Sequence, residues 1–261
     1  MVNTAQWIAA VRARESARPD RLFDDPYAQA LAGPDGFAAM ARSERAAGGE
    51  NRMIPVRVRW FDDAILSAFS SGIRQVVMLG AGLDTRPYRL RSVTDIHWYE
   101  LDRRDLLEAK AAALPPPGSV TAVAADLARE LPLSPFEEPV AWVAEGLFFY
   151  LTESSIVDLL RRAAERSPAG AVFLADVMGT TGLSGPALRG YREWCERTGS
   201  PPPFGCDDPA ALFERGGWRL VAASPPGAPD ANFGRLPPLP AGLRPGAPHF
   251  VRAWLAPPTR S

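Results

Sequence analysis

The chain has 261 residues, of which 46% are hydrophobic and 23% are charged, and its formal net charge is -1. This length and composition are typical of a folded domain with a sizeable core. A general nucleic-acid-binding protein carries a basic surplus, so we expect no nucleic-acid partner. The sequence has no run of 18 apolar residues and predicts neither a membrane span nor a membrane partner.

The two cysteines, Cys195 and Cys206, are too few for a disulfide framework. They could pair with each other, but the sequence favours a reduced protein of the cytoplasm. The first residues, MVNTAQWIAAVRARES, lack the long apolar run and the cleavage site of a secretory signal. No CxxC pair or His/Cys cluster predicts a metal site.

Residues 1–70 are predicted to form a helical cap. Hydrophobic residues recur at helical spacing over 4–17, with Thr4 as N-cap, and over 53–70. Between these helices, Asp25 is typical of a helix start and Gly33 of a helix end. The polar residues that follow, up to residue 49, are expected to be mobile or weakly helical.

A regular alternation of strands and helices is predicted over residues 71–178. Alternation of this kind indicates a parallel sheet that is covered by helices on both faces. Four of its strands end in a carboxylate, and in open α/β sheets the ligand lies along that carboxyl edge. The predicted strands are 75–80, 96–102, 120–126, 139–146 and 171–178, the helices between them include 103–114 and 153–166, and the strand-ending acids are Asp102, Asp126, Glu145 and Asp176.

Residues 179–216 are predicted to be an inserted helical segment, with helices over 186–199 and after Asp208. Residues 217–256 supply the last two strands. No linker or internal repeat divides the chain, so we expect a single domain over residues 1–261.

Gly80, Ala81 and Gly82 form a tight turn directly after the first predicted strand, in VVMLGAGLDTRPYRL. A lone GxG is a weak signal for a nucleotide loop. The preceding strand strengthens it, and so do Glu100 and Asp102 about 20 residues later, because acids at that distance accept hydrogen bonds from ribose hydroxyls.

The remainder of this turn argues against a dinucleotide. Thr85 stands where the third glycine of GxGxxG would be, and Asp84 would repel a pyrophosphate. S-adenosylmethionine, which has an adenosine but no phosphate, fits better. Asp84 and Arg86 could instead pair with each other and only pin the loop.

Several motifs, in this order along the chain, resemble the leucine carboxyl methyltransferase family. They are VRARES and RLFDDPYAQAL, the glycine turn, YELD with Lys110 eight residues later, AADL, and AEGLFFYLT. Together they span residues 5 to about 177. The bacterial branch of this family includes polyketide carboxyl O-methyltransferases. The resemblance therefore implies a class I methyltransferase fold, with six parallel strands and an antiparallel seventh, and S-adenosylmethionine as cofactor.

The resemblance also implies which residues bind the cofactor. Arg57 is expected to pair with the cofactor carboxylate. Arg14 matches a second positively charged residue of the family, but only by its spacing along the chain. The implied set is Gly80, Ala81, Gly82 and Asp84 at the glycine turn, Asp102 at the ribose, Asp126 and Leu127 beside the adenine, and Glu145, Arg57 and Arg14 at the amino-acid end. Asp102, Asp126 and Arg57 each have a plainer alternative, as a helix cap, a turn acid and a solvated arginine.

Aromatic residues supply the candidate substrate pocket. Trp60, Phe149, Tyr191 and Trp194 are expected to line it, although aromatic residues more often belong to the core. Tyr150, at a strand end, is a candidate catalytic residue.

The sequence favours O-methylation of a small molecule at a carboxylate, which gives a methyl ester. A carboxylate is ionised at neutral pH and needs no base, whereas a phenol usually does. Of the two histidines, His97 begins a strand at the opposite edge, and His249 reaches the crevice side only if the last strand is antiparallel. The alternatives are a hydroxyl acceptor, a protein C-terminus, a binding protein without activity and an NAD-dependent oxidoreductase.

Overall fold

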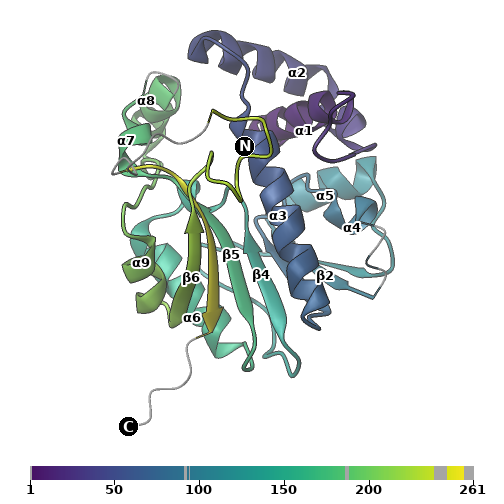
Figure 1. Ribbon diagram of the computed structural model, residues 1–261, viewed down its shortest axis with the longest axis vertical. Coiled ribbons are helices and arrows are strands. Elements are labelled where there is room, and N and C mark those ends of the chain that lie inside the picture. Colours follow the sequence, from purple (N-terminus) through teal and green to yellow (C-terminus); the bar gives the residue numbers. More distant parts are fainter. Residues whose placement is uncertain (1, 91–92, 94, 186–187, 238–245, 256–261) are drawn as a thin grey trace.

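The structure is a computed structural model that describes residues 2–90, 93, 95–185, 188–237 and 246–255. Figure 1 shows one mixed sheet, with α3 running along it and with α1 and α2 above one of its ends. The sheet order is β3-β2-β1-β4-β5-β7-β6.

The bounds of the elements agree with most of the predicted ranges. The strands are β1 (Gln75–Leu79), β2 (His97–Asp102), β3 (Val120–Ala124), β4 (Val140–Ala144), β5 (Val172–Val177), β6 (Trp218–Ser224) and β7 (His249–Leu255). The helices are α1 (Val2–Ser16), α2 (Ala28–Ala47), α3 (Met53–Ser70), α4 (Arg86–Arg89), α5 (Arg104–Ala113), η1 (Phe148–Tyr150), α6 (Glu153–Glu165), α7 (Thr180–Leu183), α8 (Arg189–Thr198) and α9 (Pro209–Arg215).

Strand directions confirm the predicted fold class. β1 to β5 pair in parallel, β7 runs antiparallel to β5, and β6 runs antiparallel to β7. Within the described part of the chain, β7 is therefore the strand that opposes the other six. Its start, His249, lies opposite Val177 at the end of β5, so the β7 start is on the carboxyl edge of the sheet.

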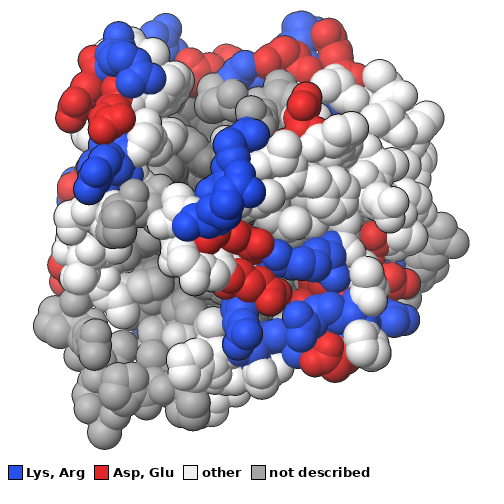
Figure 2. Space-filling model, turned by 90° about the horizontal axis from the view of Figure 1, so that it is seen from above, with Lys and Arg blue, Asp and Glu red and all other residues white. Residues whose placement is uncertain are grey.

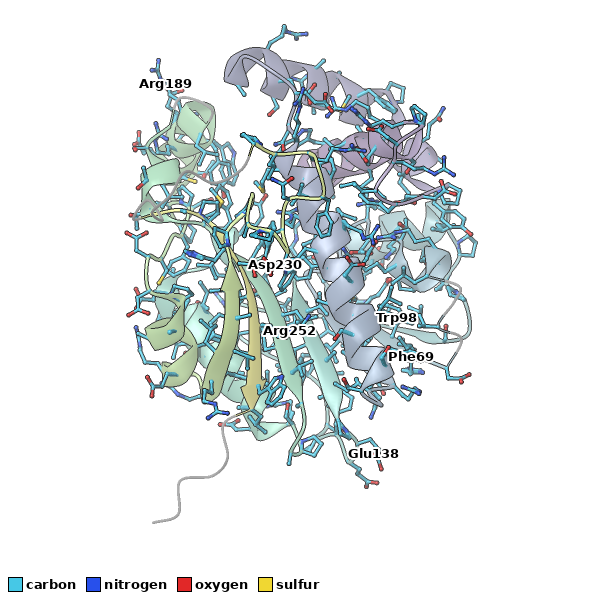
Figure 3. The ribbon with its side chains drawn as sticks, viewed as in Figure 1. Phe69, Trp98, Glu138, Arg189, Asp230 and Arg252 are labelled. Carbon is cyan, nitrogen blue, oxygen red and sulfur yellow. The ribbon has the colours of Figure 1, made fainter. Side chains whose placement is uncertain are left out.

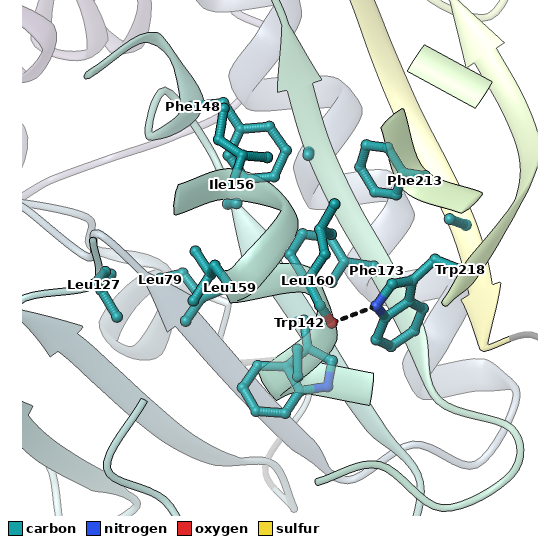
Figure 4. Close-up of a cluster of buried hydrophobic side chains, with 14 of the residues drawn as sticks. Leu79, Leu127, Trp142, Phe148, Ile156, Leu159, Leu160, Phe173, Phe213 and Trp218 are labelled. Carbon is teal, nitrogen blue, oxygen red and sulfur yellow. Dashed lines mark hydrogen bonds between the residues drawn. The ribbon is translucent and has the colours of Figure 1, made fainter. Parts of the chain in front are cut away.

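One face of the sheet carries an apolar core beneath α6 and α9. Thr152 caps α6 by accepting the backbone N–H of Ser155, and the helix then places Ile156, Leu159 and Leu160 on the sheet. The buried Trp218 indole N–H is satisfied by the Leu160 carbonyl at 2.9 Å (Figure 4). Apolar burial of this kind supplies most of the stabilisation of such a domain.

The other face is covered by α3, the long helix predicted over 53–70. Phe61 and Ile65 are fully buried against the sheet. Trp60 is only 6% exposed and packs on Phe61 and Phe250, with ring centroids 5.2 and 5.4 Å away. Trp60 is therefore part of this core.

The cap differs from prediction in how its helices begin. α1 begins at Val2, so Thr4 is inside the helix and is not its N-cap. Asp25 is not an N-cap either, because α2 begins at Ala28 and the Asp25 carboxylate is buried in an ion pair with Arg12 at 2.8 Å. Its other oxygen accepts the Tyr27 N–H at 3.2 Å, so Asp25 closes the turn before α2 and Tyr27 occupies the N-cap position.

Gly33 is a kink and not the end of α2. Its φ of 56° leaves the helical region, and Pro34 then restarts the helix, which continues to Ala47. The segment after Gly33, which was expected to be mobile or weakly helical, is helical up to Ala47. A Cβ at Gly36 would lie 2.5 Å from the Gln6 carbonyl oxygen, so the two cap helices cross in close contact, and this packing holds the segment helical.

The predicted helix over 186–199 is α8, although residues 186–187 lie outside the described residues. Residues 238–245 and 256, which the sequence assigned to the segment of the last two strands, also lie outside them. Asp208 caps α9 as predicted, because its side chain accepts the Ala211 N–H at 3.0 Å. Both cysteines are free. No described helix is long and apolar enough to cross a membrane.

Candidate functional site

The glycine turn brings the backbone after β1 close to the end of β2. Gly80 and Gly82 have φ angles of 70° and 48°, in the left-handed region that glycine tolerates best. The N–H groups of Gly80 and Ala81 both donate to the Leu101 carbonyl, at 2.9 and 3.1 Å. A Cβ at Gly80 would lie 3.1 Å from Leu147, so the turn leaves little room for a side chain.

Asp102 ends β2 beside this turn. Its Oδ2 accepts the Gly82 N–H at 2.8 Å, and its Oδ1 accepts the Arg103 N–H at 2.7 Å. Burial raises the pKa of Asp102, and the two backbone donors act against that rise. Each oxygen keeps a lone pair for a further donor, as a ribose-binding carboxylate requires.

Asp84 and Arg86 do pair with each other. Asp84 accepts the Arg86 backbone N–H at 2.8 Å and also contacts its guanidinium, while Arg86 Nε donates to Asp62 at 2.6 Å. Burial alone would raise the pKa of Asp84, but Arg86 and neighbouring cations outweigh it and lower that pKa to about 2. These contacts agree with the alternative interpretation, in which Asp84 and Arg86 pair with each other and hold the loop in place. Asp84 stays a cofactor-binding prediction that these contacts do not test.

Arg57 lies between two carboxylates from neighbouring strands. Its Nε donates to Glu145 at 2.9 Å and its Nη1 to Asp176 at 3.1 Å. Burial by itself would lower the pKa of Arg57, but Asp176 and Glu145 outweigh it and raise that pKa. Arg57 is only 8% exposed, so it is not the solvated arginine of the alternative interpretation.

Two polar atoms of this group remain available. Glu145 Oε2 lies 2.7 Å from Arg86 Nη2, but the alignment is poor, and this buried oxygen accepts no hydrogen bond from any residue that the structure describes. Arg57 Nη2 likewise donates no hydrogen bond within the described ranges. Glu145 Oε2 is thus ion-paired with Arg86 but still has a hydrogen bond to accept, and Arg57 Nη2 has one to donate, which suits a ligand that carries both an ammonium and a carboxylate.

Arg14 lies in a different group. Its guanidinium is held by Glu44 of α2 at 2.6 Å, within the cap. Arg12, which the sequence analysis did not single out, is the α1 arginine that reaches the glycine turn, because its Nη2 donates to the Leu83 carbonyl at 2.6 Å. VRARES contains both arginines, and only the direction in which the helix faces distinguishes them.

Asp126 and Leu127 follow β3. Asp126 is exposed and accepts the Ala128 N–H at 3.2 Å, which is the geometry of a turn acid. Leu127 is 6% exposed and belongs to the apolar core beneath α6. Both residues lie at the carboxyl edge, as the predicted adenine contacts require.

Three of the four predicted pocket aromatics lie together with Tyr150. Phe149 lies 5.1 Å from Tyr191, and Tyr191 lies 5.6 Å from Trp194, between ring centroids. Tyr150 contacts Phe149 at 5.0 Å. Burial raises the pKa of Tyr150, and the nearby Arg57 cation opposes part of that rise. This aromatic group therefore adjoins the Arg57 group, and Trp60 is not a member of it.

The two histidines lie at opposite edges of the sheet. His249 begins β7 on the carboxyl edge, and its Nδ1 is buried without a hydrogen-bond partner among the described residues. Burial lowers the pKa of His249, which favours the neutral form. His97 begins β2 at the amino edge, where it contacts the Thr121 hydroxyl at 2.8 Å.

A hollow of about 570 Å³ lies at the amino edge, lined by Gln75, Tyr99 and residues 132–138. In Figure 3, Glu138 marks this end of the molecule and Arg189 of α8 marks the opposite end. Because the paired carboxylates and the glycine turn are at the carboxyl edge, we place the site there and not in this hollow.

Acidic and basic side chains are intermingled on the face seen from above (Figure 2). Within the cap, Arg14 and Arg18 pair with Glu44, Glu50 and Asp20. That face, in its described part, has no broad basic patch of the kind that binds a nucleic-acid backbone. The described residues also contain no cluster of His, Cys, Asp and Glu suited to a metal ion.

Known proteins resemble this chain in sequence and in fold. A protein of Mycobacterium avium (strain 104), described as an S-adenosyl-L-methionine-dependent methyltransferase, is 36% identical over 251 residues, which cover 84% of this chain and 82% of that protein. The crystal structure of a DUF574 family protein from Streptomyces avermitilis covers 95% of this chain and 97% of its own, with a TM-score of 0.60 and 19% identity. Human N-acetylserotonin methyltransferase in complex with SAM covers 85% of this chain and 59% of its own, with a TM-score of 0.52 and 13% identity.

The two structural likenesses agree with the fold described above. The sequence pattern that defines leucine carboxyl methyltransferases matches residues 5–164, which include the glycine turn, Asp102, Arg57 and Glu145. The chain belongs to the leucine carboxyl methyltransferase family.

Proposed function

We propose that this chain is an S-adenosylmethionine-dependent O-methyltransferase that acts on a small molecule. The observation that carries the proposal is the pairing of Arg57 with Glu145 beside the glycine turn, with one donor and one acceptor left over. The family membership and the methyltransferase relative support the same cofactor.

The residues at the carboxyl edge fit this cofactor part by part. Asp102 would accept hydrogen bonds from the ribose hydroxyls, and Asp126 and Leu127 would flank the adenine. Glu145 Oε2 would accept from the ammonium, and Arg57 Nη2 would donate to the carboxylate. When bound, S-adenosylmethionine supplies a methyl group activated by a sulfonium.

The protein's part in the reaction is to align an acceptor oxygen with that methyl group. Such a transfer gains most of its rate from proximity, orientation and the exclusion of water. Phe149, Tyr191 and Trp194 offer an apolar surface next to the Arg57 group, over which an acceptor would lie. Tyr150, which is half-buried next to this surface and near Arg57, would orient the acceptor.

The first candidate acceptor is a carboxylate, whose product is a methyl ester. A carboxylate is ionised at neutral pH, so the step needs no base. The motifs shared with bacterial polyketide carboxyl methyltransferases support an acceptor of the natural-product kind. A peptide C-terminal carboxylate would undergo the same chemistry.

A hydroxyl is the second candidate acceptor, and His249 favours it. This histidine lies on the carboxyl edge, has an unpaired Nδ1 and is biased towards its neutral form, as a general base must be. Asp207 lies near enough to His249 to oppose part of that bias.

Binding of S-adenosylhomocysteine tests the core of the proposal. A ligand at a hundredfold excess over its dissociation constant stabilises the native state by about 2.7 kcal/mol, so we expect a clear rise in melting temperature. No shift at millimolar S-adenosylhomocysteine would contradict the proposal. Methyl transfer from labelled cofactor to carboxylic or phenolic acceptors then tests for activity. Transfer would exclude the alternative in which the chain binds the cofactor without catalysing a reaction.

The His249→Ala variant decides between the two acceptors. If the product is an ester, turnover should change little, because no base is required. The matched control is His97→Ala, which removes the histidine at the opposite edge. Turnover of phenols alone, abolished by His249→Ala in a folded protein and unaffected by His97→Ala, would make His249 the base and the ester assignment wrong.

A further inference from the structure

Asp176 is a carboxylate at the carboxyl edge, with a side chain only 14% exposed, to which the cofactor contacts above give no role. It lies in β5 opposite Phe250, on the face that α3 covers. Its Oδ2 accepts a hydrogen bond from Arg57 Nη1 at 3.1 Å, and its Oδ1 accepts the backbone N–H of Gly146. One carboxylate thus holds both the guanidinium and the turn that follows β4.

The Arg57 guanidinium is fixed at two of its three nitrogens. Glu145 accepts from Nε at 2.9 Å, and Asp176 accepts from Nη1. A planar guanidinium held at two nitrogens cannot rotate about its bond to the side chain, so the direction of Nη2 is set as well. If Asp176 did not accept from Nη1, Glu145 would hold the group at Nε only.

Gly146 shows how closely the turn follows this guanidinium. Its φ is +68°, and a Cβ added there would lie 3.4 Å from both Nη1 and Nη2 of Arg57. The turn backbone therefore lies against the guanidinium, and the Asp176 bond to the Gly146 N–H keeps it there.

We propose that Asp176 is a positioning residue that orients Arg57 Nη2 towards the carboxylate of the bound cofactor. This inference rests on the proposed function, in which Arg57 binds that carboxylate. On charge alone, a second carboxylate near the site would weaken binding of an anionic group. The geometric role and the charge effect therefore predict changes of opposite sign, and a measurement can separate them.

The test compares two ligands on the Asp176→Asn variant by calorimetry. S-adenosylhomocysteine has the amino-acid end, whereas 5′-methylthioadenosine lacks it. Replacing a charge-assisted hydrogen bond by a neutral one should weaken S-adenosylhomocysteine binding about tenfold. Binding of 5′-methylthioadenosine should stay within about twofold, since that ligand has no group for Arg57 to bind.

Two further variants show whether the effect passes through Arg57. In an Arg57→Ala background, Asp176→Asn should cause no additional loss of S-adenosylhomocysteine affinity, because the group that it positions is gone. Asp63→Asn is the matched control, since it neutralises a 43% exposed carboxylate of α3 that pairs with Arg59 away from the site. It should change neither affinity.

Three results would overturn the proposal: an unchanged affinity for S-adenosylhomocysteine, an equal loss for both ligands, or a tighter binding of S-adenosylhomocysteine. The last would show that Asp176 competes with the cofactor for Arg57. Should Asp176→Asn fail to fold, Asp176→Glu shifts the carboxylate by one methylene, and the same selective loss is expected. Wild-type protein that binds neither ligand would instead contradict the proposed function.

Discussion

The two faces of the sheet are built on different physical principles. Beneath α6, the core is apolar, and the indole N–H groups of Trp142 and Trp218 each find one acceptor, at 2.8 and 2.9 Å. Beneath α3, apolar packing around Phe61 gives way at the carboxyl edge to buried ion pairs centred on Arg57 and Arg86. Apolar side chains tolerate exchange at constant volume, whereas a buried charge depends on each of its partners. The α6 face therefore contributes mainly to stability and tolerates substitution. On the α3 face, the ion pairs limit which substitutions the candidate site can accept.

The largest expected effect is on the apolar face. Phe173 is fully buried and contacts the rings of Phe213 and Trp218 at 5.7 and 5.3 Å. Phe173→Ala should lower the free energy of unfolding by about 4 kcal/mol, through lost burial and the cavity that remains. Urea unfolding measures this change, and the folded variant should bind S-adenosylhomocysteine as the wild type does. A lower affinity of the folded variant for S-adenosylhomocysteine would show that packing on the apolar face influences the site on the other face.

Arg86→Ala should be nearly as destabilising on the charged face, by about 3 kcal/mol. It leaves the carboxylates of Asp62, Asp84 and Glu145 without one cation, although Arg89 still pairs with Asp62 at 2.7 Å. That remaining pair places the loss at the lower end of the range for a broken buried ion pair. A change below about 0.5 kcal/mol in urea unfolding, as for a surface residue, would mean that the ion cluster adds no stability.

Arg57→Ala should weaken ligand binding as well as the fold, because it also leaves the carboxylates of Glu145 and Asp176 without their shared cation. Loss of its charge-assisted bond to the cofactor carboxylate should weaken S-adenosylhomocysteine binding by about 2 kcal/mol, or about 30-fold. Adenosine, which has no carboxylate, should bind almost unchanged. Calorimetry with both ligands checks this, and equal losses would assign Arg57 a structural role.

Asp84→Asn should make stability less sensitive to acid, and this change in pH dependence is the smallest of the four effects. The pKa of Asp84 is lowered to about 2, so its ionised form adds stability that is lost as the pH falls from the unfolded value near 3.8 towards 2. Between pH 4 and pH 3, the wild type should lose about 1 kcal/mol more than Asp84→Asn does. Urea unfolding of both proteins at each pH measures this difference. If both lost the same free energy of unfolding between pH 4 and pH 3, the lowered pKa would not be that of Asp84.

Much of the fold could be predicted because its signals are local. Each strand is a short apolar run, and Asp102, Glu145 and Asp176 end three of them at one edge. The short elements α4, η1 and α7 were missed because three or four residues give no periodicity.

The remainder of the site depends on long-range contacts, which a single sequence does not contain. Arg12 and Arg14 are two positions apart on α1, and only the packing of the cap decides that Arg12 reaches the Leu83 carbonyl. Trp60 and Phe61 are adjacent, so periodicity cannot tell whether Trp60 faces a pocket or the core. The ion pairs of Arg57 join residues 88 and 119 positions apart.

The link between Arg12 and Leu83 has a consequence for motion. Arg12 is 6% exposed and also pairs with Asp25, whose carboxylate accepts the Thr85 hydroxyl at 2.6 Å. Helix α1 and the glycine turn are therefore joined twice through buried polar groups, and the cap cannot detach without freeing the loop. Segments that open together share one free energy of opening, which sets how strongly their amide hydrogens are protected from exchange. A ligand held only by the loop would thus slow hydrogen exchange throughout α1, and the N-terminal helix would report on occupancy of the site.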